Sequence, residues 1–500
     1  LNTHAVLGPN GLYNVHNVGL PILLATPYFL GGVIGAKIFM VLVSSLAIVA
    51  LWRCAAHAPG DVAYRFWAVI ATTVAMPLVP GSSQIYPEIV AGLCSLVALG
   101  CIANARSHGS IGVVILVSCA IAFLPWLQIK YSATALVLML MLSYKIHAHE
   151  RDLKKTFFPI YITGASLFLL GAYNNFAFGS YYGPYHLWQT AGLEVSKQSF
   201  MVLLGLHLDQ NQGFLFQNPI NLIGLVGVGL MYTRDRFTTL GFLLVFSSLI
   251  VPNGLHPTWY GGWSFSGRFG WSAAIVFMMP TLYALLHLSN KHRRLFAAII
   301  VLSLTLQVYF FWLYAILGMN IFNKSPNTWY EAYSIFYYPV HSWLPMLYDL
   351  RWAGDYTPNY AWSALVLALV IAGGIKNNAL WEKSRTLIFT PILLAIGVGG
   401  LNAEQADNTE VFLASQLPSN TGRQLGTARI VEKNIDQPGF VNFGPYFPLR
   451  KGEYLVEIRY QSPAEIFDVI GSADVFNARS HTKLLEIPIK GTAGQWPTLT

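Results

Sequence analysis

Charged residues are too sparse over the first four fifths of this 500-residue chain for that part to fold in water. Residues 1–401 contain only 32 Asp, Glu, Lys and Arg side chains, whereas residues 402–500 contain 20. A soluble domain uses about 25% charged residues to keep its surface wet. Lipid must therefore be the solvent for most of residues 1–401. The rise in charge after Leu401 predicts two domains, a transmembrane domain 1–401 and a soluble domain 402–500.

Long apolar runs recur through the first domain. Crossing a hydrocarbon core of about 30 Å takes roughly 20 apolar residues in a helix. We expect a polytopic α-helical membrane protein with about 12 spans in this chain, at 33–52, 66–80, 88–103, 111–127, 131–146, 157–178, 218–232, 237–252, 272–289, 295–318, 361–376 and 386–401.

The orientation follows from the loops, because Lys and Arg collect on the cytoplasmic side of a membrane. One set of alternating loops contains fifteen of these residues and the opposite set contains five. The sequence therefore predicts that the N-terminus and residues 402–500 lie outside the cytoplasm, and that chemistry takes place at the outer face. The net charge of +8 is explained by these scattered inner loops. No basic stripe interleaves with aromatic residues, so we expect no nucleic-acid partner.

Two further segments have recognisable patterns. Residues 19–32 (GLPILLATPYFLGG) predict a short interfacial helix bounded by glycines and interrupted by Pro27. In the second domain, GEYLVEIRYQ alternates with the period of two expected of a strand, and SADVFNA and TKLLEIPIK predict two more strands. We expect a jelly-roll-like β-sandwich on the outer face. Its lack of cysteine excludes a disulfide framework or a CxxC metal site there.

Glu88 follows the outer turn PGSSQIYP with no other charge nearby. Ionisable groups at membrane depth are costly and point to function. This carboxylate could bind a divalent cation, a sugar hydroxyl or an acceptor, and Tyr86 in the same turn is a candidate for substrate contact. An acid directly after Pro87 could equally stabilise the first turn of a helix through the helix dipole.

Arg268 is the only charge in the outer segment HPTWYGGWSFSGRFG. An arginine can clamp a phosphate through two hydrogen bonds, and the rings of Trp259 and Trp263 could stack on a sugar. An interfacial aromatic belt with one snorkelling arginine would look similar, but a belt has no need of the glycines.

Four other residues are substrate-binding candidates. Lys130, in the very short outer loop within FLPWLQIKYS, could meet a lipid phosphate or simply anchor the interface. His16 and Asn17 precede the interfacial helix and could contact a metal or a phosphate, or be ordinary polar loop residues. Asp209, in HLDQNQGFLF, is similarly ambiguous.

Several of these segments together resemble the GT-C superfamily of polyprenyl-phosphate-sugar-dependent membrane glycosyltransferases, which includes protein mannosyltransferases and lipid A aminoarabinose transferases. The likeness lies in the interfacial helix, the outer turn ending in YPE, LPWLQIKY between close spans, and WYGGWSFSGR before another span. FGPYFPLRKGEYLVEIRY and the strands after it resemble the carbohydrate-binding-module-like domains of some bacterial members.

The resemblance implies an inverting sugar transfer from a polyprenyl-phosphate donor to a glycan, lipid or protein acceptor at the outer face of a bacterial inner membrane. It implies one further span and a catalytic acid upstream of Leu1. Glu88 matches the family's second acidic residue and is our catalytic candidate, and His16 and Asn17 match the place of metal- or phosphate-contacting residues. A divalent cation, Mg²⁺ or Mn²⁺, is the only cofactor that it suggests.

Two other function classes remain open. A lipid or glycan transporter would need inverted repeats and polar residues at mid-span, and the sequence has neither. A non-enzymatic glycan-binding or assembly subunit, with the β-domain as the working part, remains an alternative.

Overall fold

The computed structural model describes residues 5–56, 58, 60–104, 110–184, 197–255, 264–316, 343–345, 347, 357–374, 412–414, 417–426, 428–444, 455–477 and 482–499. The chain divides into two compact units, Leu1–Val411 and Phe412–Thr500. The domain boundary expected at 401/402 falls outside the described residues.

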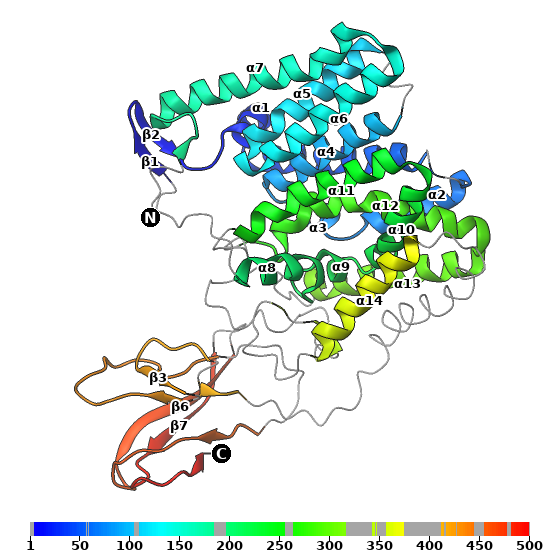
Figure 1. Cartoon of the computed structure of the whole chain (residues 1–500). Coiled ribbons are helices and arrows are strands. Elements are labelled where there is room, and N and C mark those ends of the chain that lie inside the picture. The colour runs from blue at the N-terminus through cyan, green and yellow to red at the C-terminus, as the bar shows by residue number, and fades with distance from the viewer. Residues whose placement is uncertain are drawn as a thin grey trace. The chain divides into compact units, whose positions relative to one another are not determined.

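The first unit is a bundle of helices, coloured blue to yellow in Figure 1. Its helices are α1 (Gly19–Ala55), α2 (Val62–Thr73), α3 (Leu78–Gly81), α4 (Pro87–Ala103), α5 (Ile111–Leu127), α6 (Ser132–Glu150), α7 (Leu153–Phe178), α8 (Lys197–Leu208), α9 (Phe214–Gln217), α10 (Asn221–Arg234), α11 (Arg236–Ile250), α12 (Trp271–Lys291), α13 (Arg293–Phe311) and α14 (Thr357–Gly374). Short helical turns follow or precede some of them: η2 (Ile129–Tyr131), η4 (Val251–Leu255), η5 (Arg268–Gly270) and η6 (Trp312–Ile316).

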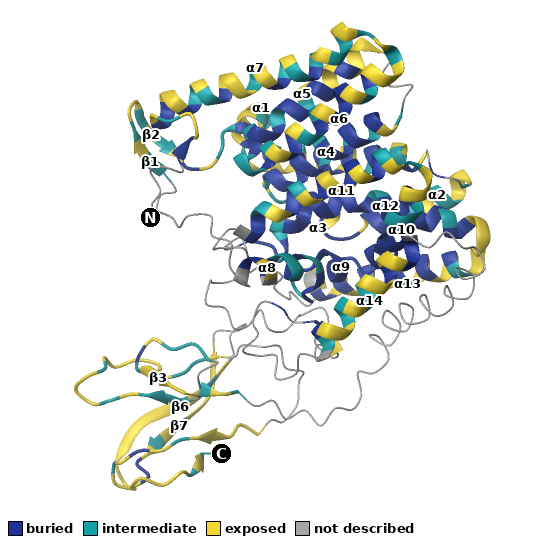
Figure 2. Cartoon of the chain, in the orientation of Figure 1, coloured by how far each residue is buried: buried dark blue, intermediate teal, exposed yellow. Residues whose placement is uncertain are grey.

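Six segments of the described chain are long and apolar enough to cross a membrane, which makes this unit a polytopic membrane domain. They are Gly19–Ala55, Ile129–Glu150, Leu153–Phe178, Arg236–Gly254, Arg268–Lys291 and Arg293–Phe311. Their burial separates the centre of the bundle from its rim (Figure 2). In an apolar 18-residue stretch of the segment that contains α12, 89% of the residues are buried. In the corresponding stretch of α7 the share is 17%, and α7 exposes apolar side chains such as Phe168. Lipid is the solvent that such an exposed apolar helix requires.

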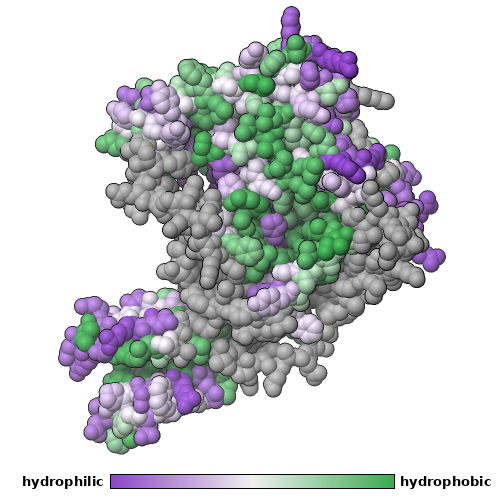
Figure 3. Space-filling view, in the orientation of Figure 1, coloured by the Kyte–Doolittle hydropathy of each residue, from purple (hydrophilic) through white to green (hydrophobic). Residues whose placement is uncertain are grey.

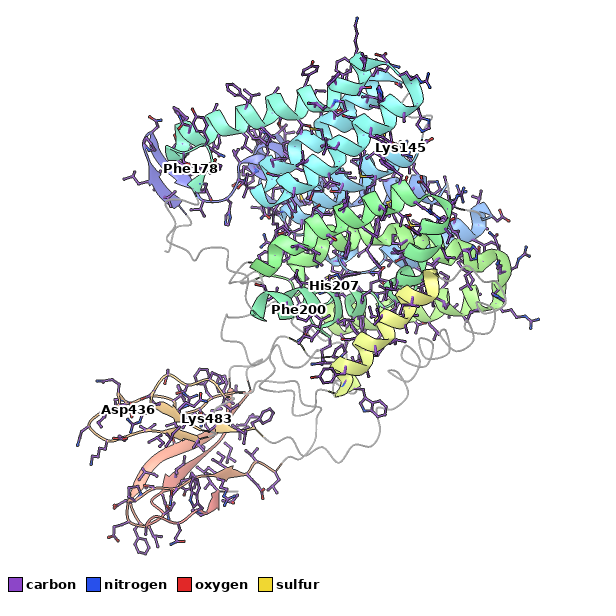
Figure 4. All side chains as sticks on the ribbon, in the orientation of Figure 1. Lys145, Phe178, Phe200, His207, Asp436 and Lys483 are labelled. Carbon is purple, nitrogen blue, oxygen red and sulfur yellow. The ribbon has the colours of Figure 1, made fainter. Side chains whose placement is uncertain are left out.

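The short turns that are rich in Lys and Arg lie at one side of the bundle. Helices α6 and α7, α10 and α11, and α12 and α13 are joined by short turns rich in Lys and Arg. Figure 3 shows the purple side chains of the α6–α7 end at the upper right, and Figure 4 places Lys145 near that end and Phe178 at the opposite end of α7. We call the basic side the inner end and the other side the outer end.

Aspartates begin three helices at the inner end. Asp61, Asp152 and Asp235 each accept a hydrogen bond from a backbone N–H in the first turn of α2, α7 and α11. Such N-caps satisfy amides that have no partner within the helix. These acids therefore have a local structural task.

The predicted break at the glycines after the interfacial helix is confirmed, whereas the predicted interruption at Pro27 is wrong, because Pro27 lies inside α1 in helical geometry. Helix α1 is interrupted at Gly31 (φ −145°, ψ 19°) and Gly32 (φ 57°, ψ −144°), both outside helical geometry. Before α1, strands β1 (Ala5–Gly8) and β2 (Gly11–Asn14) form a hairpin that the sequence analysis did not predict. It packs on the end of α7 through the Asn10 side chain, which donates to the Phe176 carbonyl at 2.7 Å.

Two predicted spans need correction. The run 66–80 is not one helix, because α2 ends at Thr73 and α3 begins at Leu78. Pro77 lies between them, and a proline disfavours helix in the residue before it and removes a backbone donor. The run 218–232 forms α10, which at 14 residues is short for a span. The run 386–401 lies outside the described residues, so the count of about 12 spans stays a prediction.

The second unit contains short strand pairs. Antiparallel pairing joins β3 (Arg423–Leu425) to β4 (Ala428–Ile430), β5 (Ile458–Arg459) to β8 (Thr498–Leu499) and β6 (Val469–Asn477) to β7 (Thr482–Lys490). Strand β6 contains the first six residues of the predicted SADVFNA segment, and β7 is the predicted TKLLEIPIK segment. GEYLVEIRYQ contributes only β5 among its described residues, and Val456 is half exposed. A β-sandwich therefore stays a prediction.

Candidate functional site

Four segments meet at the outer end of the bundle around Glu88. They are the start of α4, the turn η2 between α5 and α6, the turn η4 after α11, and the turn η5 before α12. Helix α4 packs against α5, α6, α11 and α12, so these separate turns are brought to one place. Each turn contributes polar or aromatic side chains to the cluster described below.

Glu88 is completely buried although it is ionisable. It is the second residue of α4, after Pro87, and its side chain has no exposed surface. Its Oε2 lies 3.3 Å from Arg268 Nε, and its Oε1 lies 3.9 Å from Lys130 Nζ. The second distance is too long for a hydrogen bond, and Oε1 has no hydrogen-bond partner among the described residues. Burying a carboxylate is tolerable here because two cations compensate its charge.

Lys130 is held by a hydrogen bond and two cation–π contacts in addition to its ion pair with Glu88. Its ammonium donates to Asn253 Oδ1 at 3.0 Å, and it lies 4.7 Å from the ring centre of Phe269 and 5.2 Å from that of Tyr131. Asn253 is itself fixed, since its amide donates to the carbonyls of Leu249, Ile250 and Phe269. The lysine is thus fixed in place and remains 18% exposed.

Arg268 lies between Glu88 and Tyr86. Its guanidinium carbon is 4.1 Å from the centre of the Tyr86 ring, a cation–π distance. Burial raises the pKa of the Tyr86 phenol, while Arg268 and the backbone of Phe265 act in the opposite direction. The phenol therefore stays neutral at pH 7, and its ring can support the guanidinium. The arginine side chain is 20% exposed.

The backbone that carries Arg268 is a tight turn. Gly267 has φ +73°, a conformation that glycine adopts without steric cost. Its N–H donates to Gln212 Oε1, and Gln217 Nε2 donates to the carbonyl of Ser266 at 2.6 Å and to that of Asn211 at 3.0 Å. Two buried amide side chains thus hold the turn from which Arg268 projects.

The cluster has one negative and two positive charges, so it has a net charge of +1 at the outer end of a membrane domain. The partly exposed groups are the two cations, and the carboxylate lies beneath them. An arginine and a lysine in this arrangement can bind an oxyanion such as a phosphate through charge-assisted hydrogen bonds. Fixed cations also stabilise negative charge that develops on a leaving group.

The structure thus brings together Glu88, Lys130, Arg268 and Tyr86 from the sequence-predicted set. Their proposed roles in catalysis and substrate binding stay predictions.

Asn17 and His16 serve the surrounding scaffold in this structure. The Asn17 side chain donates to the Pro125 carbonyl at 3.0 Å and joins the start of α1 to the end of α5. His16 is exposed, and its backbone N–H donates to Asn14 Oδ1 at 2.9 Å. Metal or phosphate contact through these two residues stays a prediction.

Asp209 has backbone partners. Its Oδ1 accepts from the N–H groups of Asn211 and Gln212, at 2.8 and 3.0 Å, and its Oδ2 accepts from Leu347 N–H at 3.0 Å. The side chain is buried, which favours a structural role over direct contact with substrate.

The other predicted substrate contacts, Trp259 and Trp263, lie outside the described residues. No three His, Cys, Asp or Glu side chains lie together as metal ligands within the described ranges. Binding of a divalent cation stays a prediction.

Sequence reasoning missed Asn253, Phe269, Gln212 and Gln217. Asn253 follows an apolar run in VPNGL, a turn signal that indicates a helix end but no partner. The two glutamines flank the Gly213 turn in DQNQGFLFQ, and their task depends on a segment some 50 residues away.

No protein-family model matches the chain, and no curated protein matches it. Among solved structures, it is similar to an apo crystal structure of ArnT from Cupriavidus metallidurans, with a TM-score of 0.39 and 14% sequence identity. The match covers 78% of this chain and 64% of the ArnT chain, so it spans less than two thirds of that protein. A likeness at this level assigns neither a fold family nor an activity to the chain.

Proposed function

We propose that this protein transfers a sugar from a polyprenyl-phosphate-linked donor to an acceptor at the outer face of the membrane. The observation that carries the proposal is the net positive cluster of Lys130 and Arg268 over the buried Glu88. A lipid-linked phosphate delivers negative charge at headgroup depth while its prenyl chain stays in hydrocarbon. Two fixed cations at the outer end of a membrane domain suit that ligand.

In the proposed reaction, an acceptor hydroxyl attacks the anomeric carbon from the side opposite the phosphate. The bond from that carbon to the phosphate oxygen breaks, and polyprenyl phosphate leaves with the bonding pair. Lys130 and Arg268 stabilise the charge gained by this leaving group. The hydroxyl proton passes to a general base. The configuration at the sugar is inverted.

We assign Glu88 a positioning role in this reaction. Its side chain has no exposed surface and its oxygens face the two cations, so it holds them in place, whereas an acceptor would need to touch an accessible base. The acceptor is a glycan, a lipid or a protein. The resemblance favours a bacterial inner membrane and an outer carbohydrate-binding role for residues 402–500.

The test is a transfer assay in proteoliposomes with a panel of labelled polyprenyl-phosphate sugars. Lys130→Ala and Arg268→Ala are each expected to lower transfer about 100-fold, the usual cost of removing one group that stabilises developing charge. Lys145→Ala is a matched control, because Lys145 lies 3.9 Å from Asp235 and 4.8 Å from the Phe237 ring at the inner end. Arg234→Ala is the second, since Arg234 stacks on a tyrosine away from the cluster.

Both controls should retain wild-type transfer within about twofold, as expected for contacts near the surface. Undiminished transfer in Lys130→Ala and Arg268→Ala would reject this site. Binding of polyprenyl phosphate without turnover of any donor would instead support the non-enzymatic glycan-binding or assembly role.

A further inference from the structure

We infer that Gln217 and Gln212 are positioning residues that set the place of Arg268 by holding the Gly267 turn with their side-chain amides. This inference rests on the proposed function, in which Arg268 holds the donor phosphate. It adds two residues that lie outside the Glu88 cluster and make none of the ion pairs that define that cluster.

The hydrogen bonds of Gln217 are the first evidence for this inference. One nitrogen, Nε2, donates to the Ser266 carbonyl at 2.6 Å and to the Asn211 carbonyl at 3.0 Å. It thus joins the backbone just before Arg268 to the turn that follows α8. Gln217 is only 3% exposed. A buried amide is costly unless it is hydrogen-bonded, and these bonds go to backbone carbonyls at both sides of the junction.

Gln212 supplies the second contact. Its Oε1 accepts from the N–H of Gly267, the residue directly before Arg268. A Cβ at Gly267 would lie 2.4 Å from Gln217 Nε2 and 2.6 Å from the Gln212 carbonyl oxygen. The two glutamines therefore enclose the turn closely, on the side that a side chain would otherwise occupy.

The position of this turn decides what Arg268 can reach. Its Nε is 3.3 Å from Glu88 Oε2, and its guanidinium carbon is 4.1 Å from the centre of the Tyr86 ring. A backbone shift of about 1 Å would break the ion pair with Glu88 and lengthen the contact with Tyr86, and misplacement of that size in an active site costs up to about 100-fold in rate.

The same hydrogen bonds extend to another outer segment. Asp209 accepts from the N–H groups of Gln212 and Leu347, and Gln210 N–H donates to the Pro345 carbonyl at 3.0 Å. Pro345 and Leu347 are thus joined to the turn of Arg268 through hydrogen bonds to the 209–212 segment. This connection gives Asp209 a task that its sequence neighbourhood alone did not indicate.

The first experiment is a double-mutant cycle in the full chain, purified in detergent micelles, with undecaprenyl phosphate as the probe. Gln217→Leu removes both donated hydrogen bonds and keeps a similar volume, so it should weaken binding about tenfold. In an Arg268→Ala background, the same change should alter binding by less than about twofold, because Gln217 acts through Arg268. A general loss of structure would lower binding in both backgrounds.

Gln307→Leu is the matched control. Gln307 is also buried, at 7% exposure, but it lies on α13 and its Nε2 has no hydrogen-bond partner among the described residues. This variant should bind undecaprenyl phosphate as wild type does. If Gln217→Leu fails to fold, Gln217→Met takes its place, since methionine adapts to irregular gaps in a core.

The second experiment separates this inference from the proposed function. Hydrogen exchange at the Gly267 amide reports the turn directly, and Gln217 does not itself bond that amide. Exchange should become at least about tenfold faster in Gln217→Leu and stay unchanged in Gln307→Leu. If wild type does not bind the probe, the proposed function fails while faster exchange still supports the positioning of the turn. Additive effects in the binding cycle, or unchanged exchange in Gln217→Leu, would overturn the inference.

Discussion

Replacing Glu88 by glutamine tests whether the buried carboxylate holds the two cations. The substitution keeps the shape of the side chain and changes the net charge of the cluster from +1 to +2. Removing one partner of a buried ion pair costs about 3–5 kcal/mol because the other charge stays buried. Lys130 and Arg268 are 18% and 20% exposed, and Lys130 keeps its bond to Asn253. We therefore expect a loss near the lower limit, about 3 kcal/mol.

The assay is thermal unfolding in detergent with and without an anion. Inorganic phosphate and polyprenyl phosphate should stabilise Glu88→Gln more than wild type, because each replaces the lost negative charge. An additional unit of positive charge at about 4 Å is worth up to about 4 kcal/mol at an effective dielectric constant of 20. An increase in phosphate affinity of tenfold or more is therefore expected.

Asp235→Asn is the control at the inner end. Asp235 also pairs with a lysine at 3.9 Å, but its side chain is 45% exposed. Exposed pairs contribute about 1 kcal/mol or less, so this variant should lose little stability and gain no phosphate affinity. Wild-type stability in Glu88→Gln, or equal stabilisation of both proteins by phosphate, would refute the counter-ion role of Glu88.

Three further changes have defined outcomes. Gly267→Ala should lower the free energy of unfolding by about 2 kcal/mol, because the new Cβ meets Gln217 and φ is +73°, and titration with undecaprenyl phosphate should show weaker binding. Asp209→Ala should cost about 3 kcal/mol in thermal unfolding, since buried backbone N–H groups, that of Leu347 among them, lose their acceptor. Burial tends to raise the pKa of Asp235, but hydrogen bonds from Thr238 and the charge of Lys145 outweigh it and lower that pKa. The stabilisation by Asp235 is therefore complete above the pKa of the unfolded state and is lost as pH falls through the lowered pKa of the folded state. Asp235→Ala should lower the free energy of unfolding by about 1 kcal/mol at pH 7 and make that free energy depend less on pH in this acidic range.

The sequence was sufficient to predict which charges would meet. Glu88, Lys130 and Arg268 each stand nearly alone in a separate outer turn, and a bundle brings turns of the same end together. The break at Gly31 and Gly32 was equally local, because adjacent glycines after an apolar run need no distant partner to end a helix.

Other features depend on tertiary contacts that no local pattern encodes. In the sequence, Gln212 and Gln217 look like ordinary polar loop residues. Their role becomes visible only from their hydrogen bonds to Gly267 and Ser266 in the folded chain. The alternation around Val456 predicted a strand with a buried face, yet in the described structure this residue is half exposed and outside β5. Period-two alternation shows that a strand could bury one face, but the partner surface decides whether it does.

A comparison of the two ends of the bundle shows why function is assigned to one of them. Lys130 at the outer end and Lys145 at the inner end have almost the same surroundings, with a phenylalanine ring at 4.7 or 4.8 Å and a carboxylate at 3.9 Å. The inner carboxylate, Asp235, also caps a helix through Thr238, so its oxygens have a structural use.

The outer carboxylate differs in ways that matter for a ligand. Glu88 is fully buried, faces Arg268 in addition to Lys130, and has one oxygen without a hydrogen bond among the described residues. Its cluster therefore has two positive charges for one negative charge, and both positive side chains are partly exposed. A basic residue at the inner end can be explained by topology alone, whereas the surplus positive charge of the outer cluster is what the proposed binding of a donor phosphate would require. Phosphate should accordingly stabilise the wild-type protein against thermal unfolding, and this stabilisation should disappear in a Lys130→Ala/Arg268→Ala double variant but persist in Lys145→Ala.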